Sequence, residues 1–375
     1  MVWNYTEPVN IRFGAGIVGK LKNVAREMGL DRGILVCDPF FATNGLADSI
    51  MDENKELLVA EYSNISPNPE TKEVDACAQI MRKEKIQFTV ALGGGSSMDC
   101  AKAASTVCFT NDSIEKYHMT GVALPKEHLP IIAIPTTAGT GSEVTCVSVL
   151  SNHLLGKKGP INNDNFYPQV ALIDPELTYT LPKFQTASCG IDVLCHALEG
   201  FWSKGHQPIC DALALHGARL VFQYLRRACE NGYDTEAREK MAEASVIAGL
   251  AFTLPKTTSS HACSFPLTNF YHISHGEACG LTLDYFARIN AKASGEDGKR
   301  INSFASQLGF KDMNEMADAI AQLKKDINLR TDLKEFHLTD EQVKELVNAS
   351  HHPNMLNNPV KITDELLNDM YQSMR

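Results

Sequence analysis

A chain of 375 residues with 44% hydrophobic and 21% charged residues is too long for one small core, so we expect two domains. The net charge of −10 argues against nucleic acid as a partner, because no basic patch is available to neutralise phosphates. The opening segment, Met1–Pro8, has neither a basic stretch nor an apolar core, so we expect no secretory signal. No apolar run approaches the roughly 20 residues that a membrane span needs.

The 11 cysteines are scattered through apolar surroundings, and no two of them form a Cys-x-x-Cys pair. This pattern is typical of reduced, buried thiols in a reducing cytoplasm, and it gives little support to structural zinc bound through cysteine. We therefore expect a cytoplasmic protein with no membrane or nucleic-acid partner. We also expect a homo-oligomer, in the form of a dimer.

The first half of the chain alternates strand-like and helix-like segments. A helical pattern near 18–27 is followed by short apolar runs, which predict strands at 32–37, 87–92, 129–134 and 170–173. Strands separated by helical patterns predict βαβ units and a mainly parallel sheet. After Pro182 long helical periodicities dominate, for example over 210–222 and 237–249. We therefore expect an α/β domain over 1–182 and an all-helical domain over 183–375.

A glycine-rich run, Leu92-Gly-Gly-Gly-Ser-Ser-Met-Asp99, follows a predicted strand and opens a helix. Its glycines let the backbone approach an anion, and the helix dipole adds a favourable potential, so we predict phosphate binding here. The run is neither Gly-x-Gly-x-x-Gly nor a Walker loop, and many tight turns also use a glycine triplet.

A second run, Ile134–Thr145, is dense in hydroxyls and glycines and also follows a predicted strand. It suits hydrogen bonding to phosphate, ribose or an amide, although it is equally compatible with a turn capped by Thr140 or Ser142. Asp38 ends another strand, where a carboxylate can accept from ribose hydroxyls. The rigid turn Ser66-Pro-Asn-Pro69 can hold Asn68 at the same rim of the sheet.

A divalent-metal set is indicated in the second half of the chain. Asp192 and His196 lie four residues apart in a predicted helix and so share one face. His261 and His275 would be roughly 21 Å apart along an unbroken helix, so both reach one ion only if the chain turns back. Pro266 and the irregular run 268–274 offer places for that break. The alternative is that the Asp192–His196 pair is an ordinary surface or capping arrangement.

These motifs together resemble the iron-containing (group III) alcohol dehydrogenases. Gly93-Gly-Gly-Ser-x-x-Asp99, Pro135-Thr-Thr-Ala-Gly-Thr-Gly-Ser-Glu143, Gly190-x-Asp-x-x-x-His196 and His261-x13-His275-Gly276 occur in the same order in that family, and the resemblance covers nearly the whole chain. It implies a dinucleotide-binding α/β domain, a helical metal-binding domain, and hydride transfer between NAD(H) and an aldehyde or primary alcohol.

The resemblance also implies the site residues. The implied metal ligands are Asp192, His196, His261 and His275. The implied cofactor-binding residues, taken with the rim residues above, are Asp38, Asn68, Gly94, Gly95, Ser96, Asp99, Thr136, Thr137, Thr140 and Lys158. Around the reacting carbon we place His261, His275, Phe265 and His272. Iron is the metal that the family implies, but one carboxylate and three imidazoles also admit zinc or manganese.

Two departures from the family bear on the substrate. The histidine that many members carry four residues after the third ligand is Phe265 here, and the usual proline before the fourth ligand is Ser274. Small donors run from Thr257 to Ser264, with Lys256 and His272 near in sequence. The run from Lys256 to Thr268 resembles the branch that acts on sulfo- or phosphonoacetaldehyde, so we expect a short, anionic aldehyde.

Three other functions stay open at this point. A general short-chain alcohol dehydrogenase or propanediol dehydrogenase would differ only in its pocket. A metal-dependent lyase of the dehydroquinate-synthase type shares the architecture, although the Pro135–Glu143 run and the Asp-x3-His pair fit a dehydrogenase better. A non-enzymatic scaffold or nucleotide sensor would keep the metal merely for structure.

Overall fold

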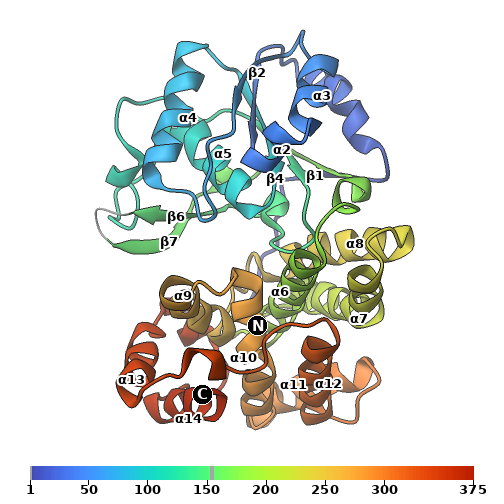
Figure 1. The fold of residues 1–375 in the computed structure, drawn as a ribbon, viewed down its shortest axis with the longest axis vertical. Coiled ribbons are helices and arrows are strands. Elements are labelled where there is room, and N and C mark those ends of the chain that lie inside the picture. The colour runs from blue at the N-terminus through green and yellow to red at the C-terminus, as the bar shows by residue number, and fades with distance from the viewer. Residues whose placement is uncertain (1, 153–155) are drawn as a thin grey trace. The chain divides into compact units, whose positions relative to one another are not determined.

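The computed structural model describes residues 2–152 and 156–375. The chain divides into two compact units. We call Thr6–Thr137 with Ser142–Thr178 the sheet unit, and Met1–Tyr5, Ala138–Gly141 and Tyr179–Arg375 the helical unit. The α/β and all-helical architecture expected from the sequence is confirmed (Figure 1). The domain boundary at residue 182 stays a prediction.

The sheet unit is built on six parallel strands in the order β1-β8-β5-β4-β2-β3. The strands are β1 (Asn10–Phe13), β2 (Gly33–Cys37), β3 (Leu58–Tyr62), β4 (Phe88–Gly93), β5 (Ile131–Pro135) and β8 (Val170–Ile173). A separate antiparallel hairpin pairs β6 (Val147–Asn152) with β7 (Lys157–Asn162). The helices of this unit are α1 (Leu21–Glu27), α2 (Pro39–Thr43), α3 (Leu46–Glu53), α4 (Thr71–Lys83) and α5 (Gly95–Val107).

Both faces of the sheet are covered, which explains why its central strands are apolar throughout. Ile34 and Val36 of β2 pack in a core that includes residues of α4 and α5. The alternate residues, Leu35 and Cys37, pack in a second core that includes residues of α1 and α3. The four strands predicted from apolar runs are present, whereas β1, β3 and the hairpin were not predicted. β3 was missed because it is an edge strand whose central residues are partly exposed.

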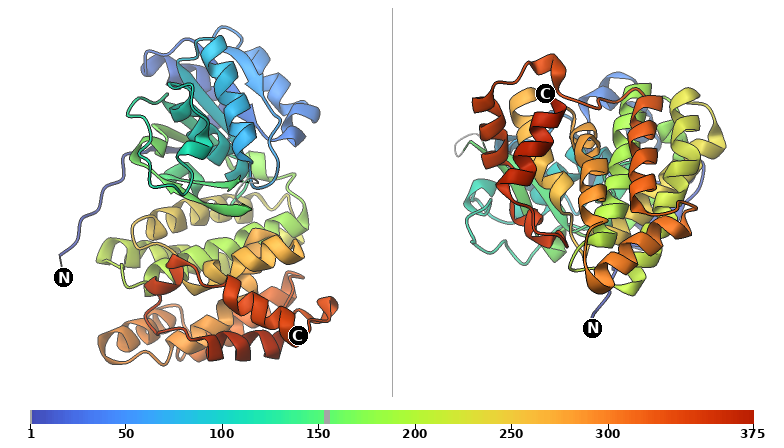
Figure 2. Two further views of the ribbon diagram at one scale, coloured as in Figure 1. Left: turned by 90° about the vertical axis from the view of Figure 1, so that its left-hand side faces the viewer. Right: turned by 90° about the horizontal axis from the view of Figure 1, so that it is seen from below.

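The helical unit has one large core. Its helices are α6 (Lys183–Trp202), α7 (Pro208–Glu230), α8 (Thr235–Phe252), α9 (Ser259–Tyr271), α10 (His275–Asn290), α11 (Gly295–Gln307), α12 (Met313–Asp326), α13 (Asp340–Ala349) and α14 (Asp364–Met374). α6, α7 and α8 pack side by side, and α10 packs against both α6 and α9 (Figure 2). The buried helix α6 is therefore held on several sides, which fixes the direction of the side chains along it.

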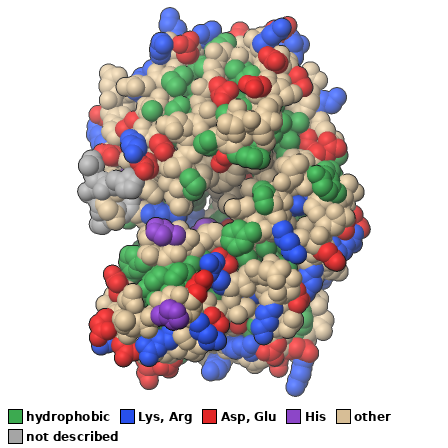
Figure 3. Space-filling view, in the orientation of Figure 1, with side chains coloured by type: hydrophobic (Ala, Val, Ile, Leu, Met, Phe, Trp, Pro, Cys, Tyr) green, Lys and Arg blue, Asp and Glu red, His purple; other side chains and the backbone are tan. Residues whose placement is uncertain are grey.

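The surface drawn in Figure 3 has acidic and basic side chains interspersed over both units. Among the described residues, no helix is both long and apolar enough to cross a membrane.

Candidate active site

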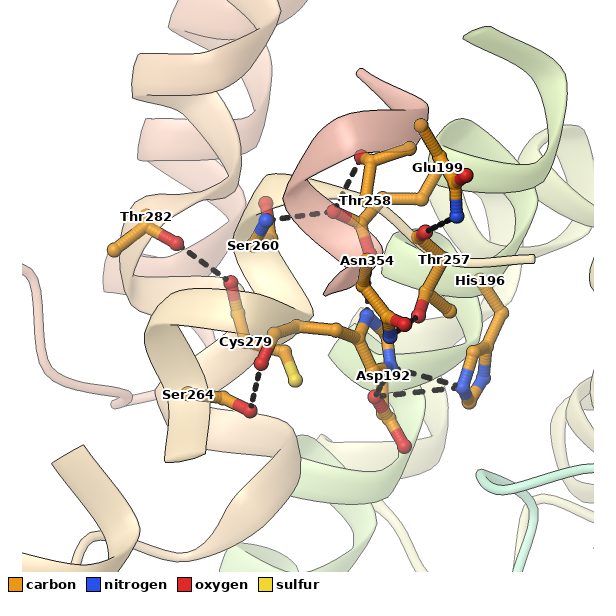
Figure 4. Close-up of polar contacts among 12 residues, drawn as sticks. Asp192, His196, Glu199, Thr257, Thr258, Ser260, Ser264, Cys279, Thr282 and Asn354 are labelled. Atoms are coloured by element: carbon orange, nitrogen blue, oxygen red, sulfur yellow. Dashed lines mark hydrogen bonds and ion pairs between the residues drawn. The ribbon is translucent and has the colours of Figure 1, made fainter. Parts of the chain in front are cut away.

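The first part of the site comes from one face of α6. Asp192 and His196 are one helical turn apart, and only 2% and 4% of their surfaces are exposed. Asp192 Oδ1 lies 4.0 Å from His196 Nε2. Figure 4 shows the two side chains directed toward each other, with their polar atoms at the closest approach.

His261 and His275 reach the same point because the chain turns back between them. His261 lies in the first turn of α9, and His275 is the first residue of α10. The break falls at His272, which ends α9 with a left-handed backbone (φ 55°), whereas Pro266 stays inside the helix. The sequence analysis offered both Pro266 and the run after it, and the run is where the helix ends.

The structure brings the four expected ligands together. His261 Nε2 lies 3.1 Å from His196 Nε2 and 3.6 Å from Asp192 Oδ1, and the rings of His261 and His275 are 5.4 Å apart between centroids. Asp192 Oδ1 is buried and has no hydrogen-bond partner, which is costly unless a cation compensates it. A carboxylate oxygen and imidazole nitrogens converging on one point fit a divalent metal ion.

Glu199, on the same face of α6, was not among the expected site residues. It is fully buried, and its carboxylate accepts from Thr258 Oγ1 at 2.7 Å and from the Ser260 amide at 2.6 Å. Its other oxygen accepts from His261 Nδ1. This bond puts the ring hydrogen of His261 on Nδ1 and leaves Nε2 free to face Asp192. The helical spacing from Asp192 and His196 is the signal that could have identified it.

His196 is oriented in the same way by the backbone. Its Nδ1 lies 3.3 Å from the Gly139 carbonyl oxygen, so a hydrogen on Nδ1 leaves Nε2 as the metal-facing atom. Gly139 is required here because a Cβ atom would lie 2.8 Å from Cys189 Cβ. The second glycine-rich run therefore contributes to the ligand set through its backbone.

Burial dominates the electrostatics of these groups. It raises the pKa of Asp192 to about 6, and the charge of His261 only partly opposes this. Burial also lowers the pKa of His196, with His261 and His275 adding to the effect. Burial lowers the pKa of His261 as well, but the carboxylates of Glu199 and Asp192 together outweigh it, so the net pKa is raised. A buried carboxylate beside a neutral imidazole is a donor set that a cation stabilises.

Next to Phe265 lies a second group that the sequence did not indicate. The Phe265 ring packs against His352 with centroids 4.6 Å apart. His352 Nδ1 accepts from the Asn354 amide at 3.2 Å, which leaves Nε2 to carry the ring hydrogen. Burial, followed by the charge of His261, lowers the pKa of His352. Asn354 also donates through Nδ2 to Thr257 Oγ1 at 2.7 Å. His352 was not among the residues expected at the site.

The small donors before Phe265 divide into two groups. In the first group the hydroxyls have partners: Thr258 Oγ1 donates to the Glu199 carboxylate, and the Ser264 hydroxyl donates to the His261 carbonyl at 2.8 Å. The hydroxyls of Ser259 and Ser260 are buried without a hydrogen-bond partner. Of the basic residues nearby in sequence, Lys256 is half-buried with a left-handed backbone (φ 67°), and His272 is exposed.

The expected cofactor loops follow the carboxyl ends of adjacent parallel strands. Cys37 of β2 is in register with Leu92 of β4, and Gly93 is in register with Pro135 of β5. The residues that come next are therefore aligned along one edge of the sheet, and they are Asp38, Gly94, Gly95, Ser96, Thr136 and Thr137. Gly93 has φ 145°, a conformation that other residues rarely adopt. Nucleotides bind at this edge in open α/β sheets.

Two more of the expected cofactor residues, Asn68 and Lys158, form a hydrogen-bonded chain with Ser96. The Asn68 amide donates to Ser96 Oγ at 3.2 Å, and Lys158 Nζ donates to Asn68 Oδ1 at 2.5 Å. Asn68 has a left-handed backbone (φ 62°), as the turn between two prolines suggests. The hairpin that carries Lys158 is thus tied to the loop that opens α5.

Asp99 and Thr140 stand apart from this arrangement. The Asp99 carboxylate accepts from Ser142 Oγ at 3.2 Å and from the Val149 amide at 3.0 Å, so it fastens two loops to α5. Lys102 Nζ donates to Ser142 O at 2.7 Å and to Val147 O at 3.0 Å. Thr140 belongs to the segment Ala138–Gly141, which is grouped with the helical unit.

Known proteins resemble this chain along its whole length. Residues 8–175 match the family model described as iron-containing alcohol dehydrogenase. Residues 186–374 match the C-terminal model of the Fe-containing alcohol dehydrogenase family.

Individual relatives cover the chain almost completely. Alcohol dehydrogenase 4 of Saccharomyces cerevisiae is 33% identical over 96% of this chain and 95% of its own length. The 1,3-propanediol dehydrogenase of Citrobacter freundii is 33% identical over 92% of this chain and 90% of its own length. Among solved structures, sulfoacetaldehyde reductase from Bifidobacterium kashiwanohense, in complex with NAD+, is 59% identical with a TM-score of 0.97, covering 100% of this chain and 99% of that one.

Proposed function

We propose that this chain, which belongs to the iron-containing alcohol dehydrogenase family, reduces sulfoacetaldehyde to its alcohol with NADH. The reaction class, hydride transfer between a nicotinamide and an aldehyde or alcohol, comes with the family. The substrate rests on one observation, the 59% identity to a sulfoacetaldehyde reductase, far above the 33% identity to the yeast alcohol dehydrogenase. Family membership also favours a dehydrogenase over the lyase and the non-enzymatic scaffold.

Asp192, His196, His261 and His275 are the residues that would hold the metal. When bound, the ion supplies a Lewis acid that polarises the carbonyl and stabilises the negative charge that hydride transfer creates on its oxygen. Iron is the metal that the family description gives, and zinc and manganese remain candidates. Glu199 and the Gly139 carbonyl orient two of the imidazoles before any ion arrives.

The sheet unit would bind NADH along the edge where β2, β4 and β5 end. The loop at Gly94, Gly95 and Ser96 opens α5, so its amides and the helix dipole suit the pyrophosphate. Asp38 uses one oxygen to cap α2 by accepting from the Phe40 amide at 2.8 Å. The rest of its carboxylate can accept from a ribose. We assign the remaining contacts to Asn68, Asp99, Thr136, Thr137, Thr140 and Lys158.

The far end of the aldehyde would meet the group beside Phe265. A sulfonate keeps its charge at neutral pH and offers only acceptor oxygens. We assign the cation to Lys256, which is half-buried and near in sequence, and the neutral donor to His352, whose ring hydrogen is on Nε2. An alkyl tail would leave these donors unpaired, which disfavours unsubstituted aldehydes. Phe265 covers the apolar side of the same group through its packing on His352.

The test compares kcat/KM for acetaldehyde, propanal, glycolaldehyde, sulfoacetaldehyde and phosphonoacetaldehyde with NADH, in the presence of added iron, zinc or manganese. We expect sulfoacetaldehyde to be the best substrate. Phosphonoacetaldehyde tests whether the charge or the shape of the head group sets the substrate preference, because its head group is also an anion. Turnover of propanal that equals or exceeds that of sulfoacetaldehyde would refute the anionic pocket and favour the propanol or propanediol alternative.

We further propose a homodimer in the cytoplasm. Val2 and Trp3 near the amino terminus are exposed apolar residues, and β1 is an edge strand with one unpaired side, so both offer surface to a second copy.

The cysteines are free thiols, buried except for the half-buried Cys189, which suits a reducing compartment. Light scattering after gel filtration, with and without residues 1–5, tests the dimer.

A further inference from the structure

Helix α10, which begins with the expected ligand His275, packs directly against α6. A Cβ atom added to Gly276 would lie 2.0 Å from the Ser188 carbonyl oxygen and 3.0 Å from Asp192 Cβ, so only a glycine fits there. Ser188 precedes Asp192 by one helical turn and lies on the same face of α6. The position of His275 therefore depends on a contact with the helix that carries two other expected ligands.

The Ser188 hydroxyl makes two hydrogen bonds to the start of α10. Its Oγ accepts from the Glu277 amide at 3.1 Å, and it lies 2.9 Å from Ser274 Oγ, with which it shares a hydrogen. The Glu277 amide belongs to the first turn of α10, whose amides have no partner within the helix. Ser274 is the N-cap residue of α10, but its own side chain makes no capping bond. Ser188 therefore caps α10 from a different helix.

The side chain of Glu277 attaches the same turn of α10 a second time. Its carboxylate is 2% exposed and accepts from the Arg330 amide at 3.0 Å and from the Arg330 guanidinium at 2.6 Å. The residues before and after His275 are thus both held, and Ser188 contacts each of them. The direction in which the His275 ring leaves the backbone is set by these contacts.

An ordinary helix cap does not account for this arrangement. A cap is commonly supplied by the N-cap residue itself, as at α13, where Thr339 accepts from the Gln342 amide at 3.2 Å. Ser188, in contrast, lies 89 residues away from the amide that it caps, and it lies one turn from Asp192. Ser274 is one of the two positions at which the sequence departs from the family, and no role for it follows from the proposed function.

We propose that Ser188 is a positioning residue of the metal centre, and that its hydroxyl holds His275 in place relative to Asp192. A ligand that is held before the ion arrives loses less conformational freedom on binding, which raises the affinity for the metal. One face of α6 thereby supplies two ligands and positions the other two, since Glu199 orients His261. The inference rests on the metal centre of the proposed function, but not on the identity of the aldehyde.

Zinc affinity, measured by competition with a chelator, tests this role in the folded protein. We expect Ser188→Ala to bind zinc at least about tenfold more weakly than wild type, because one ligand loses its support. The visible spectrum of the cobalt-loaded variant should also change, because the geometry around the ion changes. Thr339→Ala is the matched control, since it removes a capping hydroxyl from an exposed position on α13. It should lower the unfolding temperature and leave zinc affinity unchanged.

A double-mutant cycle separates positioning from general stability. Ser274→Ala alone should weaken zinc binding by about threefold or more, because half of the hydroxyl pair is lost. Its addition to Ser188→Ala should cause little further loss, since the two hydroxyls act together. A merely structural Ser188 would lower the unfolding temperature of the metal-free protein but leave zinc affinity at the wild-type level, and this result would overturn the proposal.

The wild type provides the check on the metal centre itself. If it binds neither zinc nor cobalt, both the metal centre and the role of Ser188 are wrong. If it binds zinc and Ser188→Ala binds zinc equally well, only the role of Ser188 is wrong. Should circular dichroism show that Ser188→Ala is unfolded, Ser274→Ala decides alone, because Ser274 is only half-buried. Wild-type zinc affinity in that variant would then overturn the proposal.

Discussion

The carboxylate of Glu199 accepts a hydrogen bond from His261 Nδ1 in the buried interior of the helical unit. Three donors converge on this carboxylate, namely the His261 ring, the Thr258 hydroxyl and the Ser260 amide. The bonds fix both the tautomer and the direction of the His261 ring. The metal centre is therefore arranged by a residue that does not itself belong to the expected ligand set.

Replacing Glu199 by Gln should weaken metal binding by roughly 10–100-fold, because the ring of His261 loses its orienting acceptor. The measurement is a competition titration with a chelator. Glu243→Gln is the matched control, since Glu243 pairs with His216 at 3.2 Å in a partly exposed position. Equal metal affinity in both variants would contradict the role given to Glu199.

Replacing His261 by Ala should remove metal and activity together, because it deletes a donor from a set with few alternatives. Metal content by elemental analysis and NADH oxidation on one preparation give the result. His128, a half-buried histidine of the sheet unit, serves as the control position. Full metal occupancy in His261→Ala would show that the ligand set is wrong.

Replacing Asp38 by Gly should raise kcat/KM with NADPH relative to NADH. A carboxylate at the ribose rim accepts from the 2′-hydroxyl and repels a 2′-phosphate, so its loss relaxes that discrimination. The comparison uses the preferred aldehyde at saturating concentration. If the wild type already shows a higher kcat/KM with NADPH, Asp38 does not lie at the ribose.

Replacing His352 by Ala should raise KM for sulfoacetaldehyde by about tenfold or more, because a donor worth at least ~1.4 kcal/mol to a charged oxygen is lost. Turnover of propanal should change little, so the ratio of the two kcat/KM values reports on the pocket. His351→Ala is the control, as His351 is an exposed neighbour that pairs with Asp364. A parallel loss for both aldehydes would indicate a structural or catalytic role.

Glu143 should make the stability of the sheet unit depend on pH. Burial raises its pKa from the ordinary value of 4.5 to about 7. A raised folded-state pKa gives a contribution that is complete below about 4.5 and is lost as the pH rises through 7. Glu143→Gln should therefore be more stable than wild type at pH 8, by up to a few kcal/mol, with a smaller difference at pH 5.

Thermal unfolding at both pH values measures this difference, with Glu176→Gln as the exposed control. A difference between Glu143→Gln and wild type that does not vary with pH would contradict a titrating Glu143. A wild-type protein that is more stable than Glu143→Gln at pH 8 would also contradict the prediction.

Much of the site was predictable because it depends on local regularity. Asp192 and His196 share a face through the helical repeat alone, and the glycine-rich loop follows a strand that its apolar residues make recognisable. The parallel sheet follows from strands that alternate with helices. The edge strand β3 was not predicted, because its half-exposed residues weaken the apolar pattern by which a strand is recognised.

The sequence by itself determined which residue types the chain offers to a metal and a nucleotide, and on which predicted helices and strand ends they lie. Only the tertiary structure decided that the left-handed turn at His272 returns His275 to His261 and that Glu199 orients His261. It also placed His352 beside Phe265. Periodicity describes neighbours within a few residues, whereas these approaches depend on how whole helices pack, which no local pattern encodes.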